Sequence, residues 1–265
     1  MAYPTALREL ARRVAPGVMA DRARRYERAR REQAGVTGIA REMVSAGRAE
    51  VQAGPFRGLR YPPERIAEVD APVAKLLGIY EQELYPVFAA ELARETLTTF
   101  IDIGCADGYY AVGMPVAQRA LTSRAFDIAG SARDLCAEVA RLNGVADRVR
   151  IARRFSADSL AALDGAGSGM LVLCDVEGAE AELLQERLIA RLTAATVVVE
   201  VHEHARPGLS GTLRGRFRAT HEVTRIDQQS RTAPGVAPVA VSEFRPAELH
   251  WLVCRPAEAG VMRVS

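Results

Sequence analysis

Short apolar segments alternate with helical patterns from about residue 97 onward, and this alternation constrains the fold more than any other feature of the sequence. The expected strands are 98–103, 124–128, 149–152, 170–175 and 196–201, with helices expected between them at 109–120, 132–143, 159–163 and 179–192. Two further strands are expected near 222–226 and 249–254. Continuous apolar strands separated by helices predict an α/β fold with a parallel sheet covered on both faces.

The first 95 residues follow a different pattern, in which apolar residues recur at helical spacing. Helices are expected within 4–33 and at 39–48, 73–77 and 80–92, and the stretch 54–63 is too rich in glycine and proline to be helical throughout. We therefore predict a helical N-terminal extension over 1–95 and a sheet domain over 96–265. The apolar faces of the extension need a partner, either as a cover for an acceptor pocket or as a subunit contact in a homo-oligomer.

The charge is unevenly distributed, although the net formal charge is only +2. The first 60 residues hold 13 arginines and 6 acidic residues, a net of +7, and the remainder carries −5. A basic leader can bind an anionic partner, but acidic residues interrupt this one, which favours a solvated helix face over a nucleic-acid surface.

The leader does not resemble a signal peptide, and no apolar run reaches the roughly 18 residues that a membrane span needs. We therefore expect a cytoplasmic protein with no membrane association. Its four cysteines (Cys105, Cys136, Cys174 and Cys254) form no closely spaced pair, so a zinc knuckle is not expected. We expect all four thiols to be reduced.

The segment FIDIGCADGY at 100–109 is the strongest local signal in the chain. An apolar strand ends in Asp102, turns through small residues and opens a helix. Gly104 and Gly108 allow close approach of the backbone to a ligand, and the helix N-terminus supplies free N–H groups.

The spacing within this loop distinguishes between nucleotide classes. A dinucleotide fingerprint requires glycine at the third and sixth positions counted from Gly104, but these are Ala106 and Tyr109. A tyrosine at the close helix–strand contact argues against a pyrophosphate binder. The acidic Asp102 instead suits a cationic ligand, such as the amino end of a methionine-like tail, held directly or through water.

Asp127 lies at the expected end of the second strand, about 20 residues past the glycine turn, where a nucleoside-binding fold has an acid that accepts both ribose hydroxyls. The alternative is a carboxylate that caps the next helix. Phe155 and Ser156, after the third strand, lie in the expected neighbourhood of an adenine ring.

These motifs resemble those of class I S-adenosylmethionine (SAM)-dependent methyltransferases, and within them the FkbM-type O-methyltransferases. The resemblance rests on FIDIGCADGY at 100–109, NGVADRV at 143–149, CDVEGAE at 174–180 and VVEVH at 198–202. It implies a Rossmann-like sheet of seven strands whose last strand is antiparallel, SAM as methyl donor, and a hydroxyl of a sugar, polyketide or similar small molecule as acceptor. Ala106 departs from the glycine that many methyltransferases carry, which should be tolerated if its φ is negative. The expected SAM-binding residues are Asp102, Gly104, Cys105, Ala106, Gly108, Tyr109, Asp127, Ile128, Phe155 and Ser156.

A second group of polar residues follows the fourth and fifth strands, at the sheet edge where open parallel sheets bind ligands. We hypothesise that Asp175, Glu200 and His202 activate an acceptor hydroxyl, with His202 as general base. Alternatively, the three hold Mg²⁺ or another divalent cation that acidifies the hydroxyl.

Several of these residues also have purely structural interpretations. Asp175 could cap the helix that follows it, and Glu180 is expected to be structural. His204 could be a loop residue, while His221 and His250 fall in late strands and are expected to be structural. The loop at 228–239 is assigned to acceptor binding as a lid or rim.

Two rival functions remain open at this level. The first is an RNA or protein methyltransferase that uses the arginine-rich leader, although the chain carries no RNA-binding module signature. The second is a non-catalytic partner protein with the same fold, which would be expected to have a damaged cofactor loop. The leading hypothesis is a small-molecule O-methyltransferase.

Overall fold

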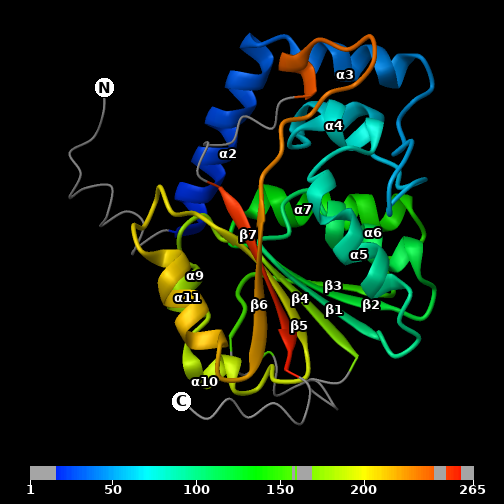
Figure 1. Cartoon of the computed structure of the whole chain (residues 1–265). Helices are drawn as coiled ribbons and strands as arrows, with labels where there is room; N and C mark the ends of the chain where they lie inside the picture. Colours follow the sequence, from blue (N-terminus) through cyan, green and yellow to red (C-terminus); the bar gives the residue numbers. More distant parts are fainter. Residues whose placement is uncertain (1–15, 157–158, 160–168, 242–248, 258–265) are drawn as a thin grey trace.

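The computed structural model describes residues 16–156, 159, 169–241 and 249–257, and its centre is one sheet of seven strands (Figure 1). The strands are β1 (Thr99–Ile103), β2 (Thr122–Phe126), β3 (Val149–Ala152), β4 (Met170–Cys174), β5 (Thr196–Val201), β6 (His221–Asp227) and β7 (His250–Pro256). Their order is β3-β2-β1-β4-β5-β7-β6, and β7 runs antiparallel to both of its neighbours. The predicted fold is therefore confirmed, including the antiparallel last strand.

Helices cover both faces of the sheet, as the apolar strands predicted. One face packs against α5 (Tyr85–Leu92), α6 (Tyr109–Ala117) and α7 (Gly130–Leu142). The other packs against α9 (Glu180–Leu183), α10 (Glu186–Ile189) and α11 (Leu209–Phe217). Among the described residues, no helix has the length and apolar character to cross a bilayer.

The N-terminal extension lies above the carboxyl ends of the parallel strands (Figure 1). It comprises α2 (Pro16–Gln33), α3 (Val36–Ser45), α4 (Pro72–Leu77) and the short 3-10 turns η1 (Pro63–Glu68) and η2 (Gln82–Leu84). A third such turn, η3 (Pro238–Val241), lies against α3 and α4.

Phe56 joins the extension to the sheet domain. Its ring packs edge-on against Tyr109 and Tyr110 at centroid distances of 5.1 and 5.5 Å. It approaches α6 so closely that a Cβ at Gly113 would lie 2.6 Å from Phe56 Cγ. The extension and one face of the sheet consequently share a single apolar core.

One helix prediction differs from the structure, and one falls almost entirely on residues that the structure does not describe. The helix expected at 179–192 is broken into α9 and α10, because Leu184 and Gln185 leave helical geometry. Arg216 of α11 compensates the break by donating from Nη1 to the carbonyls of Ala181 (2.6 Å) and Leu184 (3.0 Å). The helix expected at 159–163 lies outside the described residues, except for residue 159.

Candidate active site

Asp102 is buried near the end of β1, on the face of the sheet that α6 covers. Alternation along the strand puts Phe100 in the core on this face and Ile101 in the core on the other. Asp102 is only 2% exposed. Burial, followed by the nearby charges of Asp175 and Asp127, raises the pKa of its carboxyl well above its usual range.

The two glycines of the loop after β1 have left-handed φ values of 99° at Gly104 and 88° at Gly108. A Cβ at Gly104 would lie 1.7 Å from the carbonyl oxygen of Asp175, and one at Gly108 would lie 2.9 Å from Cys136 Sγ. Protein contacts therefore already require these glycines, whereas the sequence had suggested a ligand as the reason.

Ala106 corrects a second expectation. Its φ is +47°, not negative, a conformation that costs an L-residue roughly 1–2 kcal/mol. Its N–H donates to Asp127 Oδ2 at 3.0 Å, which helps to hold the strained turn against the end of β2. Strain of this kind tends to cluster at ligand sites.

Asp107 ties the loop to the N-terminal extension. Its Oδ1 accepts from the Tyr61 hydroxyl and the Tyr109 N–H, both at 3.2 Å. Its Oδ2 accepts from the Asp70 N–H at 3.0 Å and from Lys75 Nζ at 2.5 Å. Asp107 is 2% exposed, so this hub is an internal part of the fold.

Asp127 lies where the sequence predicted the ribose-binding acid, directly after β2. Its Oδ1 accepts from the Ala129 N–H at 2.8 Å, one residue before α7 begins. Its Oδ2 accepts from Ala106 and from Arg24 Nη2 at 2.8 Å, and the same guanidinium binds Asp70 at 3.0 Å. A carboxylate oxygen accepts about two hydrogen bonds, so Oδ2 is filled by protein donors.

Helix α2, which carries Arg24, lies across this end of the site. Asp21 caps the start of α7 by accepting from the N–H groups of Gly130 (3.3 Å) and Ser131 (3.2 Å). A Cβ at Gly17 would lie 2.6 Å from the carbonyl oxygen of Ile128. The adenosine end of the expected site is thus covered by α2.

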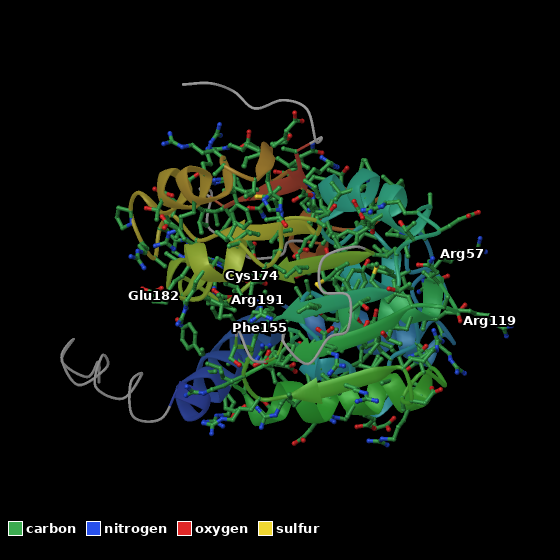
Figure 2. The ribbon with its side chains drawn as sticks, turned by 90° about the horizontal axis from the view of Figure 1, so that it is seen from below. Arg57, Arg119, Phe155, Cys174, Glu182 and Arg191 are labelled. Carbon is green, nitrogen blue, oxygen red and sulfur yellow. The ribbon has the colours of Figure 1, made fainter. Side chains whose placement is uncertain are left out.

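The remaining predicted adenine neighbours lie beside this covered end. Ile128 is 38% exposed, and the ring of Phe155 packs edge-on against Phe126 at 5.3 Å. Figure 2 shows Phe155 on the same side of the molecule as Cys174, with which it shares a core cluster. Ser156 is exposed and hydrogen-bonds Ser159.

A narrow cleft opens at the other end, with a cavity volume of about 30 Å³. Five of the predicted cofactor residues line it, namely Asp102, Gly104, Cys105, Ala106 and Tyr109, together with Asp107 and Asp175. The extension contributes Lys75, Tyr80 and Glu81, and the rest of the lining is Tyr110, Leu173 and Trp251. Gly108, Asp127, Ile128, Phe155 and Ser156 do not line it.

The structure brings together the second predicted group, beyond β4 and β5. His202 Nε2 lies 3.6 Å from Asp175 Oδ1 and 3.7 Å from Glu200 Oε2. One potential ligand atom from each of these three residues lies within 4.8 Å of the others. Glu177 Oε2 is 3.3 Å from the same nitrogen, at the end of an exposed side chain.

Glu180 holds the opposite side of the imidazole. The glutamate is fully buried, and its Oε1 lies 2.7 Å from His202 Nδ1 and accepts from the Gly178 N–H at 3.0 Å. With Nδ1 held in this way, Nε2 faces the three other carboxylates. A histidine whose far nitrogen is fixed by a carboxylate is typical of metal sites.

The electrostatics of this cluster change the expected role of His202. Burial alone would lower its pKa, but hydrogen bonds to Glu177 and Glu180, with the charges of Asp175 and Glu200, raise the pKa to about 11. In this environment the imidazole carries a proton at neutral pH and is not free to accept another. The role of His202 as general base stays a prediction, and its raised pKa opposes that role while the surrounding carboxylates are charged.

The other histidines and the cysteines have structural surroundings. His221 Nε2 lies 3.1 Å from the carbonyl oxygen of Leu192, and His250 Nε2 lies 2.9 Å from the hydroxyl of Ser210. His204 is exposed. The four cysteines are free and buried, as expected.

The late loop at 228–239 is anchored through Arg231, which forms a buried ion pair with Glu83. None of its residues lines the cleft described above. Its assignment to acceptor binding stays a prediction.

No protein-family model matches the sequence, and no curated protein matches it. The resemblance to the FkbM-type family therefore stays a prediction.

Solved structures resemble the chain at low identity. The METTL16 methyltransferase domain is 12% identical over 83% of this chain and 79% of its own, with a TM-score of 0.48. The ribosomal protein L11 methylase of Lactobacillus delbrueckii subsp. bulgaricus is 18% identical over 68% and 80%, with a TM-score of 0.42. A SAM-dependent methyltransferase from Geobacter sulfurreducens, solved with S-adenosyl-L-homocysteine, is 16% identical over 55% and 67%, with a TM-score of 0.39.

Three residues of the site were missed or given a lesser role from the sequence. Arg24 and Lys75 reach it from the extension, where no local pattern marks them. Lys75 nevertheless carried a signal, because it is the only lysine in the chain. Glu180 was expected to be structural, and the structure adds that it orients His202.

Proposed function

We propose that this chain is a SAM-dependent methyltransferase that transfers a methyl group to a hydroxyl of a small molecule, such as a sugar, polyketide or other natural-product intermediate. The observation that carries the proposal is the cleft at the end of β1, where buried Asp102 lies beside the strained turn at 104–106. A buried carboxylate whose pKa is raised by burial is stabilised by a cationic partner. The amino group of SAM is such a partner.

When bound, SAM supplies a methyl group on a positively charged sulfur, ready for in-line displacement. The residues of this chain would hold its two ends, with Asp102 on the amino-acid tail and Asp127 on the ribose. Holding the reactants in alignment can contribute roughly 7–11 kcal/mol toward lowering the barrier.

The hydrogen bonds that Asp127 already accepts limit how it could bind a ribose. Asp127 Oδ2 already accepts from Ala106 and Arg24, whereas Oδ1 accepts from Ala129. Both ribose hydroxyls can be accepted only after Arg24 has left the carboxylate. Cofactor binding is therefore expected to displace Arg24 and to loosen α2.

Asp175, Glu200 and His202 are proposed to act on the acceptor hydroxyl, because all three lie at the carboxyl end of β4 and β5. A correctly positioned general base that removes the hydroxyl proton raises the reaction rate by about 10² to 10⁴. The donor set of carboxylates and one imidazole also fits a divalent cation such as Mg²⁺ or Mn²⁺, which would acidify the hydroxyl. The clamp of Glu180 on His202 supports this second form of the proposal.

Calorimetric titration with SAM and with S-adenosylhomocysteine tests the first part of the proposal. We expect one site per chain for each nucleoside. A wild-type protein that binds neither would remove the proposal altogether.

Methyl transfer from labelled SAM to a panel of hydroxylated small molecules tests the cluster. Asp175→Asn and His202→Ala should each lower turnover at least tenfold while S-adenosylhomocysteine still binds. Undiminished turnover in both variants would show that the cluster takes no part in the reaction.

A Mn²⁺ titration tests the metal. Wild type is expected to bind the ion, and Glu180→Gln should weaken this binding about 10- to 100-fold, because the glutamate orients the histidine ligand. The matched control is Glu182→Gln, two residues along α9, whose exposed side chain pairs with Arg206. Equal affinities in both variants would argue against a metal role for His202.

A further inference from the structure

Lys75 is the only lysine in a chain with 34 arginines, and it lies in the wall of the cleft. It belongs to α4 of the extension, and only 2% of its side chain is exposed. Taking an ammonium group out of water is costly unless other groups replace the lost hydration. The surroundings of Lys75 must therefore provide that compensation.

Asp107 provides part of it, with its Oδ2 at 2.5 Å from Lys75 Nζ. The rings of Tyr80 and Tyr109 lie 4.5 and 5.5 Å from the same nitrogen and face the cation. An ammonium has three N–H donors. Within the described residues, Asp107 is the only hydrogen-bond acceptor recorded for this ammonium.

Asp107, by contrast, is well supplied with donors apart from Lys75. The Tyr61 hydroxyl and the N–H groups of Asp70 and Tyr109 all donate to it. Asp107 thus has enough donors to remain buried without a lysine, whereas Lys75 retains unused donors beside an open cleft. This asymmetry points to a second anion as the partner of Lys75.

Asp102 lies in the wall of the same cleft. Together the two residues present one carboxyl group and one ammonium to the same space, whose wall also holds the carboxyl groups of Glu81, Asp107 and Asp175. The amino-acid end of SAM is a zwitterion, with one ammonium and one carboxylate on a single carbon. A cleft with both a carboxylate and an ammonium in its wall matches that group.

We propose that Lys75 binds the carboxylate of the methionyl tail of SAM, while Asp102 binds the ammonium. The inference rests on the proposed function, and it assigns part of the N-terminal extension to cofactor recognition. The contact is a charge-assisted hydrogen bond in a site with little water, a class worth about ten- to a hundredfold in affinity.

The test pairs a change in the protein with a change in the ligand. Decarboxylated S-adenosylmethionine lacks only the tail carboxylate, and 5′-methylthioadenosine lacks the whole tail. Wild type should bind SAM about ten- to a hundredfold more tightly than the decarboxylated compound. Lys75→Met should lose most of this preference, whereas its affinity for methylthioadenosine should stay within about twofold of wild type.

Two further variants guard against a general loss of structure. Lys75→Met combined with Asp107→Asn leaves no unpaired charge behind and should reproduce the loss of preference. Lys75→Arg keeps the positive charge and should retain most of the preference for SAM over the decarboxylated compound.

The outcomes separate the inference from the proposal beneath it. If Lys75→Met weakens all three ligands equally, or if the preference for SAM survives unchanged, Lys75 is a structural partner of Asp107 and the inference is overturned. If wild type binds none of the three ligands, the proposed function itself fails.

Discussion

The two ends of the proposed cofactor site, one for the amino-acid tail of SAM and one for its adenosine, differ in how they are built. At the tail end, Asp102 and Lys75 are each 2% exposed and belong to the interior of the fold. At the adenosine end, the predicted ribose acid Asp127 is bound by Arg24, whose side chain is 30% exposed on α2. At the tail end the proposed binding groups are already buried in place, whereas at the adenosine end the guanidinium of Arg24 occupies the carboxylate that the ribose would need.

The attachment of α2 explains this difference. The helix is strongly polar and carries exposed residues such as Tyr26, at 67% exposure. Among the side chains of α2 that the structure describes, Asp21, Arg24, Arg28 and Glu32 make polar contacts with the rest of the protein. Partly exposed ion pairs contribute roughly 0.2–1 kcal/mol each, far less than a buried apolar face. We expect helix α2 to be displaced when a nucleoside binds at the proposed site.

The largest expected effect is at the tail end. Asp102→Asn should weaken S-adenosylhomocysteine binding about 100-fold, because a desolvated charge pair is worth roughly 2–5 kcal/mol. Calorimetry measures the loss, and methylthioadenosine, which has no ammonium, serves as the control ligand. The raised pKa of Asp102 means that folding disfavours its charged form, so the same variant should unfold at a slightly higher temperature at pH 7. Weak binding together with a lowered melting temperature would instead indicate damage to the fold.

The second effect is a pH dependence confined to the tail end. Because burial raises the pKa of Asp102, protonation competes with the ligand ammonium at a higher pH than for an ordinary carboxyl. Affinity for S-adenosylhomocysteine should be constant above that pKa and fall by up to about tenfold per pH unit below it. Methylthioadenosine should show no such fall, and neither should Asp102→Asn. A parallel fall for both ligands would place the titrating group elsewhere.

The smallest effect is expected at the adenosine end and has the opposite sign. Arg24→Met should tighten methylthioadenosine binding about three- to fivefold, since it frees Asp127 Oδ2 from a partly exposed ion pair. Arg28→Met is the matched control, because Arg28 lies one turn along α2 and its nitrogen is 4.0 Å from Glu68 rather than from Asp127. Weaker binding in Arg24→Met would mean that the guanidinium supports the nucleoside instead of competing with it.

The sequence predicted those parts of the molecule that local patterns encode. Apolar runs located all seven strands, and the acids near the ends of β1 and β2 were found from their distance to the glycine turn. The cluster of Asp175, Glu200 and His202 followed from the rule that strand ends share one edge of a parallel sheet.

What the sequence did not predict depends on contacts between distant segments. Arg24 lies 103 residues from Asp127, and no periodicity links the two. The positive φ of Ala106 accompanies a hydrogen bond from its N–H to Asp127, and the carbonyls at the break after α9 are satisfied by an arginine in α11. The pKa of His202 is set by four carboxylates that only folding brings together.

The ring of Phe56 against Tyr109 and Tyr110 has a consequence for any attempt to dissect the protein. A chain that began at residue 96 would expose those two tyrosine rings at the first turn after the cofactor loop, and would leave Gly113 facing a void in place of a phenylalanine. The N-terminal extension is thus part of the packing that supports the loop at 104–108. Removing it is therefore expected to destabilise the fold around that loop.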